Sequence, residues 1–149
     1  MADINLMPPF GQNGHSFAGI VATSTCKYGS VLVDGATGNH ADIKQCTSAG
    51  ETKLVGVCQS QGDPNNSGLF VVGDQVEVRD EGYAEVLFPA GTVIAMEDII
   101  IASAIAGHAK VLGAEAKPYM ILGRAKQAIT IGAAAGLASV KLALEYVPA

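Results

Sequence analysis

Five carboxylates lie close together in the chain, and their type could support catalysis or metal binding: Asp74, Glu77, Asp80, Glu81 and Glu85. Paired carboxylates can hydrolyse glycosidic bonds, and clustered carboxylate oxygens can bind a hard cation. However, Arg79 interrupts the group, and polar and apolar residues alternate from Gln75 to Arg79. Such alternation is typical of a half-buried strand. We therefore interpret the carboxylates as the solvated face and turn of one hairpin.

The histidines and cysteines form no recognisable catalytic or metal-binding motif. They are scattered along the chain as His15, His40, His108, Cys26, Cys46 and Cys58. The sequence has no CxxC spacing and no paired Cys/His spacing of a zinc site. It also lacks HExxH, GxSxG and P-loop motifs, and a thiol–histidine nucleophile would depend on the fold. We interpret the thiols as reduced, small hydrophobic side chains, and we expect no enzyme activity, no cofactor and no bound metal.

Three segments share the pattern expected of a β-hairpin. Each has an apolar-rich run, a polar or small turn that ends in glycine, and a second run; they are residues 31–43, 74–86 and 98–111. Glycine at such a turn supplies the positive backbone angle that tight hairpins need. Residues 53–58, 69–72, 119–125 and 139–146 are further strand candidates. The isoleucine-rich segment Met96–His108 could be a short helix, although its β-branched residues favour a strand.

These short strands and frequent turn signals predict an all-β fold, namely a small β-barrel or β-sandwich of short hairpins. Residues 26–149 would form this domain. Residues 1–25 differ, because Met7, Pro8, Pro9, Phe10 and Phe17 occur among glycines and amides without strand or helix periodicity. Proline holds the chain extended, and a purely solvated tail would not carry such apolar residues. We expect an extended N-terminal arm whose Met7, Pro8, Pro9, Phe10 and Phe17 contact a neighbouring subunit; a frayed terminus is the alternative.

The composition restricts the possible partners. Charged residues make up 15% of the 149 residues and the net charge is −5, without a run of Lys or Arg, so we expect no direct contact with nucleic acid. No stretch is long and apolar enough for a membrane helix, and the start has no secretory signal, so we expect synthesis in a cytoplasm and no membrane contact. So few charges favour burial of part of the surface against partner proteins, with a small-residue, water-exposed surface as the alternative.

From about Tyr28 to Tyr146, the sequence resembles the bacteriophage capsid cement proteins, also called head decoration proteins. The resemblance depends on four short elements: Gly73-Asp74 before Val76, the Ile121–Ala125 strand, the Gly132–Gly136 loop and the closing Val140-Lys141-Leu142. In place of the family's Ile-Gly pair, this chain has Leu122 before the glycine, and residues before 28 lie outside the resemblance.

The resemblance implies a non-enzymatic virion protein that binds the major capsid protein on the outside of the shell. Such a protein stabilises the shell against the pressure of packaged DNA. Family members commonly form trimers and sometimes dimers, and the small-residue loop Gly132–Gly136 favours close approach of subunits. We therefore expect self-association, as a homotrimer or otherwise as a dimer. Alternatives are a virion-surface receptor or glycan-binding β-module, against which the lack of Trp argues, and a small β-barrel enzyme or ligand carrier, for which no polar constellation is readable.

Overall fold

The computed structural model describes residues 14–149, and their regular structure is almost entirely β, which confirms the expected fold class. One turn of 3₁₀ helix, Pro64–Asn66, interrupts the strands. The strands are β1 (His15–Val21), β2 (Val31–Asp34), β3 (Asp42–Gln45), β4 (Leu54–Cys58), β5 (Gln75–Phe88), β6 (Val93–Ile94), β7 (Ile99–Ala102), β8 (Ala109–Val111), β9 (Tyr119–Ala125), β10 (Ile129–Thr130) and β11 (Gly136–Val147).

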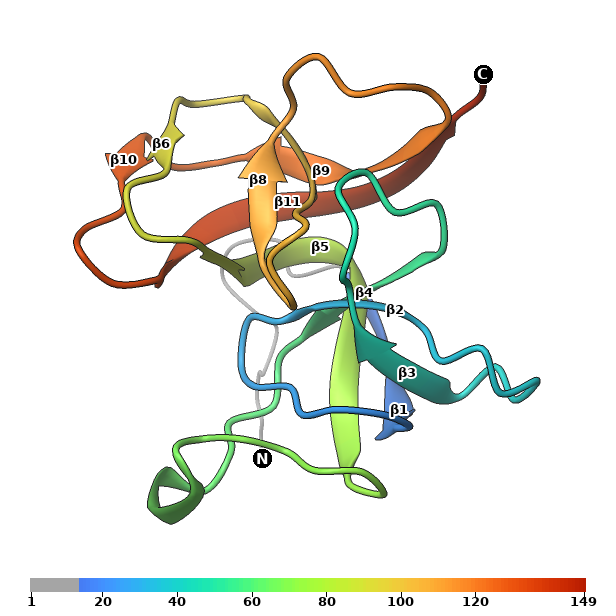
Figure 1. The fold of residues 1–149 in the computed structure, drawn as a ribbon. Coiled ribbons are helices and arrows are strands. Elements are labelled where there is room, and N and C mark those ends of the chain that lie inside the picture. The colour runs from blue at the N-terminus through green and yellow to red at the C-terminus, as the bar shows by residue number, and fades with distance from the viewer. Residues whose placement is uncertain (1–13) are drawn as a thin grey trace, which may run out of the picture.

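Five strands close into a small barrel in the order β1-β3-β2-β4-β5, because β5 pairs back with β1. Its pairs are antiparallel except β1–β3, which is parallel with Ile20 opposite Asp42. The same β-sheet continues beyond β5 as β11-β9-β7-β8, which we call the open sheet. Figure 1 shows the barrel strands below and the open sheet above, with β5 passing between them.

Strand β5 is one long strand, so the hairpin expected over residues 74–86 is wrong. Its first half pairs with β1 and β4, and its second half pairs with β11 from Ala143↔Glu81 to Gly136↔Phe88. The expected turn glycine, Gly82, has a φ of 94° but lies within the strand. A Cβ at this position would lie 2.7 Å from the Cα of Gly14. Glycine at position 82 therefore allows Gly14, the residue before β1, to pass close to β5 at the point where the pairing partners of β5 change.

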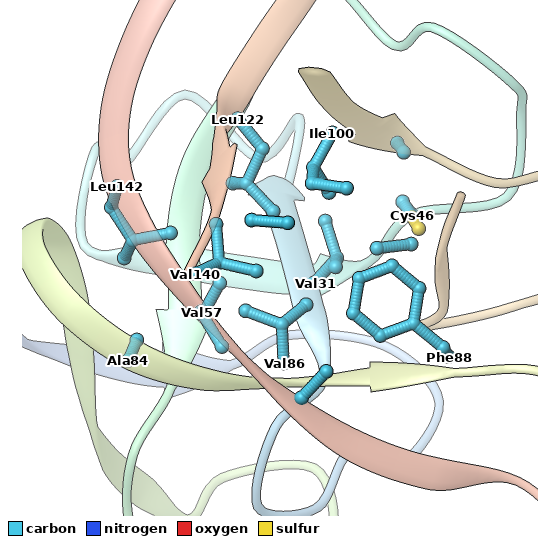
Figure 2. Packing of buried hydrophobic residues seen from close by; sticks show 14 of the residues in the cluster. Val31, Cys46, Val57, Ala84, Val86, Phe88, Ile100, Leu122, Val140 and Leu142 are labelled. Carbon is cyan, nitrogen blue, oxygen red and sulfur yellow. The ribbon is translucent and has the colours of Figure 1, made fainter. Parts of the chain in front are cut away.

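The buried side chains form two clusters. The first fills the barrel and consists of Val21, Cys26, Leu32, Ile43, Cys58, Val76 and Val78. The second, larger cluster lies between the outer wall of the barrel and the open sheet. Figure 2 shows side chains of β2, β4, β5, β7, β9 and β11 meeting in it: Val31, Val57, Ala84, Val86, Phe88, Ile100, Leu122, Val140 and Leu142.

Strand β2 contributes to both clusters, because successive side chains of a strand point to opposite faces. Leu32 lies in the barrel cluster, while Val31 and Val33 lie in the larger one. Strand β5 instead uses one alternating face for both: Val76 and Val78 lie in the barrel cluster, and Ala84, Val86 and Phe88 lie in the larger cluster. The outer side of the barrel wall therefore packs against the open sheet and forms one side of the larger cluster.

The other hairpin expectations are confirmed. β2 pairs with β3 and β7 pairs with β8, both antiparallel, and Met96–His108 contains strand β7 and the turn after it, with no helix. The expected arm over residues 1–25 is wrong for His15–Val21, which is the barrel strand β1. Non-local pairing with β5 and β3 gives this stretch its order, although its own sequence has no clear strand pattern. Met7, Pro8, Pro9 and Phe10 lie outside the described residues.

Candidate attachment surface

The carboxylates of the acidic group lie along β5 and its preceding turn, and four of the five, Asp74, Glu77, Asp80 and Glu85, have a local partner. Asp74 accepts a hydrogen bond from the backbone N–H of Val71 at 2.9 Å, and Glu77 pairs with Arg79 at 3.2 Å. Asp80 contacts His15 Nδ1 at 2.8 Å, which links β5 to β1. The oxygens of these carboxylates therefore stabilise local structure through hydrogen bonds and ion pairs. Within residues 14–149, no group of three or more His, Cys, Asp or Glu side chains could hold a metal ion.

Tyr28 joins the barrel to the open sheet. Its hydroxyl donates a 3.0 Å hydrogen bond to Glu85 on the second half of β5. Burial, followed by this hydrogen bond, raises the pKa of Tyr28 to about 12. Nearby on the open sheet, Lys141 lies 5.8 Å from the centre of the Tyr83 ring. These contacts account for the polar outer face around β5 without requiring a ligand.

Strands β6 and β10 form a separate two-stranded sheet, and the segments that contain them carry no charge. We call these segments the uncharged tip and define it as residues 89–96 and 127–136, which include β6 and β10 but no Asp, Glu, Lys or Arg. The two strands pair antiparallel, with Ile129 opposite Ile94, and they lie side by side at the upper left of Figure 1. The tip is therefore an uncharged surface in a protein of net charge −5.

The tip is firmly held by the rest of the fold. Ile94 and Ile131 are buried in the larger core cluster, and Ile129 packs against it. The backbone N–H of Ile131 donates to Thr92 at 2.8 Å, and that of Gly91 donates to Ile131 at 3.1 Å. Anchored in this way, the tip presents a fixed surface.

The outer side chains of the tip are apolar or small. Val93 is 69% exposed and Met96 is 56% exposed, and the loop residues Ala133, Ala134 and Ala135 are exposed as well. Small side chains allow another backbone to come close, and exposed apolar groups without charges favour contact with protein over water. This surface was only partly visible in the sequence, which pointed to the Gly132–Gly136 loop but missed β6.

Phe17 occupies a different place from the one expected of an arm residue. It lies in β1 opposite Val78, and its half-buried side chain packs against the barrel cluster. Val71 and Val72 form another exposed apolar pair, in the turn before β5 at the lower end of the molecule in Figure 1. They lie far from the tip in the fold and offer a comparison site with similar chemistry. Among residues 14–149, no helix is long and apolar enough to cross a membrane.

Of three comparisons with known proteins, the one with solved structures bears on the architecture. No protein-family model matches the sequence. No curated protein matches it. Among solved structures, the chain is similar to the N base of the head fiber gp8.5 of bacteriophage phi29, with a TM-score of 0.54 and 17% identity over 87% of this chain and 93% of that one. The similarity at this identity establishes a shared fold over nearly the whole of both chains.

Proposed function

We propose that this chain is a structural protein of a bacteriophage virion that binds the outer surface of the capsid and stabilises the shell against internal DNA pressure. The observation that carries the proposal is the fold shared with the base of a phage head fiber over 93% of that chain. The resemblance of residues 28–146 to head decoration proteins points to the same surface of the virion. The proposed role is attachment and reinforcement, without catalysis.

The uncharged tip is the surface we assign to self-association, as a homotrimer with a dimer as the alternative. Val93 and Met96 provide exposed apolar area, and the alanines after Gly132 provide room for close approach. Because Ile94 and Ile131 fix the tip to the core, little conformational entropy is lost when a second copy docks. Copies arranged around a symmetry axis would place several tips together.

Contact with the major capsid protein is assigned to Met7, Pro8, Pro9 and Phe10. These residues combine an apolar side-chain set with two prolines that have no backbone donor to desolvate. They precede Gly14, which lies beside Gly82 at the junction of the barrel and the open sheet. Phe17 packs against the barrel, so we assign its side chain to the fold and not to the capsid contact.

Co-sedimentation with purified phage capsids tests the attachment. Deletion of residues 1–13 is the appropriate truncation, because a longer deletion would remove β1 and open the barrel. We expect this deletion to abolish sedimentation and Phe10→Ala to weaken binding by about 10- to 100-fold, the loss of one buried aromatic side chain. Phe17→Ala should lower the melting temperature while the folded fraction still binds. Undiminished binding of the truncated chain would contradict the assignment.

Light scattering tests the self-association surface with a matched pair of variants. Val93→Glu places a charge on the tip, and Val72→Glu places the same charge on a valine that is 59% exposed elsewhere. We expect the first variant to be monomeric and the second to keep the assembly of the parent chain. A monomeric parent chain at high concentration would refute self-association. Binding to a glycan array without capsid binding would favour the receptor-module alternative.

A further inference from the structure

Two of the three cysteines lie together inside the barrel. Cys26 is 1% exposed and Cys58 is 0% exposed, and both belong to the seven-residue barrel cluster. Cys26 lies in the connection between β1 and β2, and Cys58 ends β4. The third cysteine, Cys46, belongs to the larger cluster on the other side of the barrel wall.

The backbone brings the first two cysteines close to each other. Residues 27–30 form a turn closed by the N–H of Ser30, which donates to Lys27 at 2.9 Å. Immediately after Cys26, this turn binds Cys58 twice: Gly29 N–H donates to the Cys58 carbonyl at 2.8 Å, and Cys58 N–H donates to Ser30 at 2.9 Å. The positions of both cysteines are thus fixed by the same short turn.

Each of the two thiols also shifts the pKa of the other. The hydrogen bond with Cys58 is the largest cause that raises the pKa of Cys26, ahead of burial. The same contact lowers the pKa of Cys58, against burial, which acts in the opposite direction. Of the two thiols, Cys58 has its pKa lowered and Cys26 has its pKa raised, which makes Cys58 the better nucleophile of the pair.

We infer that Cys26 and Cys58 are a redox pair that forms a disulfide inside the barrel when the chain meets a low-molecular-weight disulfide such as oxidised glutathione. The Cys58 thiolate attacks one glutathione sulfur and releases one glutathione thiolate. The Cys26 sulfur, after losing its proton, then attacks the mixed disulfide at Cys58 and releases the second. Two protein thiols are oxidised, and one glutathione disulfide is reduced to two thiols.

The disulfide would cross-link the barrel covalently. The segment between the two cysteines contains β2, β3 and β4, three of the five barrel strands. A cross-link that closes a long loop removes conformational freedom from the unfolded chain, so it stabilises the folded state most when the native geometry already brings the sulfurs together. Because both thiols are buried, the reaction must wait for local opening or take place during folding.

Peptide mapping can read the outcome without ambiguity, because trypsin separates the three cysteines. Cleavage after Lys27, Lys44, Lys53 and Arg79 puts Cys26 in residues 1–27, Cys46 in residues 45–53 and Cys58 in residues 54–79. The full chain would be incubated with oxidised glutathione, both when folded and during refolding, and then alkylated in denaturant. We expect peptides 1–27 and 54–79 to be cross-linked and peptide 45–53 to be alkylated.

Thermal unfolding tests the consequence for stability. The oxidised chain should melt about 5–10 °C above the reduced chain. The control variant Cys46→Ala should keep both the cross-link and the rise in melting temperature. Cys58→Ala should lose both. If Cys58→Ala does not fold, Cys26→Ala serves as the test variant in its place. The inference is overturned by three free thiols after both treatments, by a link that includes Cys46, by glutathione adducts alone, or by a cross-linked chain that melts no higher.

Discussion

The barrel and the open sheet share β5, yet they bury their side chains in different ways. The barrel encloses seven buried residues, two of which are cysteines, and a parallel strand pair helps to close it. The open sheet is entirely antiparallel and needs a second surface to cover its apolar face. That surface is the outer wall of the barrel, including Val31 and Val57. The comparison indicates that the open sheet has no core without the barrel, whereas the barrel has its own enclosed cluster and shares its outer wall with the larger one.

Removal of the Phe88 ring should have the largest effect on this shared core. Phe88 is fully buried at the end of β5, and Phe88→Ala should lower the free energy of unfolding by about 3–5 kcal/mol. In a Cys46→Ala background, urea unfolding would be followed by thiol reactivity, which then reports on the barrel through Cys26 and Cys58, and by tyrosine fluorescence, which includes Tyr119 and Tyr146 of the open sheet. We expect the two curves to coincide, and two separate transitions would show that the regions unfold independently.

Two leucines compare the two cores with the same substitution. Leu32 is buried in the barrel cluster, and Leu122 is buried in the larger cluster. Leu32→Ala and Leu122→Ala should each cost about 2–5 kcal/mol, and the double variant should cost the sum because the clusters lie on opposite sides of β2. Chemical denaturation of the four chains measures this. A double variant that costs clearly less than the sum would mean that the two clusters relax as one.

The junction itself can be tested at Gly82. Gly82→Ala adds a Cβ at a positive φ and directly against Gly14, so we expect a loss of about 1–3 kcal/mol. Gly91→Ala is the control, because Gly91 also has a positive φ but would meet nothing within 4 Å. The difference between the stability losses of the two variants measures the cost of disturbing the close contact between Gly82 and Gly14. Equal losses would show that this close contact contributes nothing.

The smallest effect concerns the hydrogen bond between Tyr28 and Glu85. Burial and this bond raise the pKa of Tyr28 to about 12, so the folded state favours the neutral phenol. Its contribution to stability is present below the ordinary pKa of tyrosine, about 10, and is lost as the pH rises through about 12. Thermal unfolding at alkaline pH should show this decline, and Tyr28→Phe should reduce it. Tyr146→Phe, at an exposed position, should leave it unchanged.

Local patterns in the sequence were sufficient to predict the elements whose strands pair with near neighbours in the chain. The hairpins β2–β3 and β7–β8 and the alternating strand β11 follow from periodicity and turn residues. Gly82 misled the prediction, because a glycine after Asp80-Glu81 has the same local signature whether the chain turns back or continues through a bend. Only the pairing of β5 with distant strands distinguishes the two outcomes.

The barrel closure and the uncharged tip were also hard to predict, for related reasons. Strand β1 is ordered by its pairing with β3 and β5, which follow later in the chain. Its own residues carry no strand pattern, and for this reason they were predicted to be part of an arm. The tip joins residues 89–96 to residues 127–136, and only the fold shows that these two uncharged stretches meet. The absence of charge between Lys126 and Lys141 was a visible signal that could have drawn attention to this surface.

The closure of the barrel by β1 has a consequence for how the chain folds. Ile20 pairs with Asp42 on one side and with Gln75 on the other, so β1 has its full set of partners only after β5 has been synthesised. Long-range pairing of this kind requires the entropy of a large loop to be lost before contacts compensate for it, which makes folding slow. The nascent chain therefore carries an unpaired strand edge for much of its synthesis and is exposed to aggregation during that time.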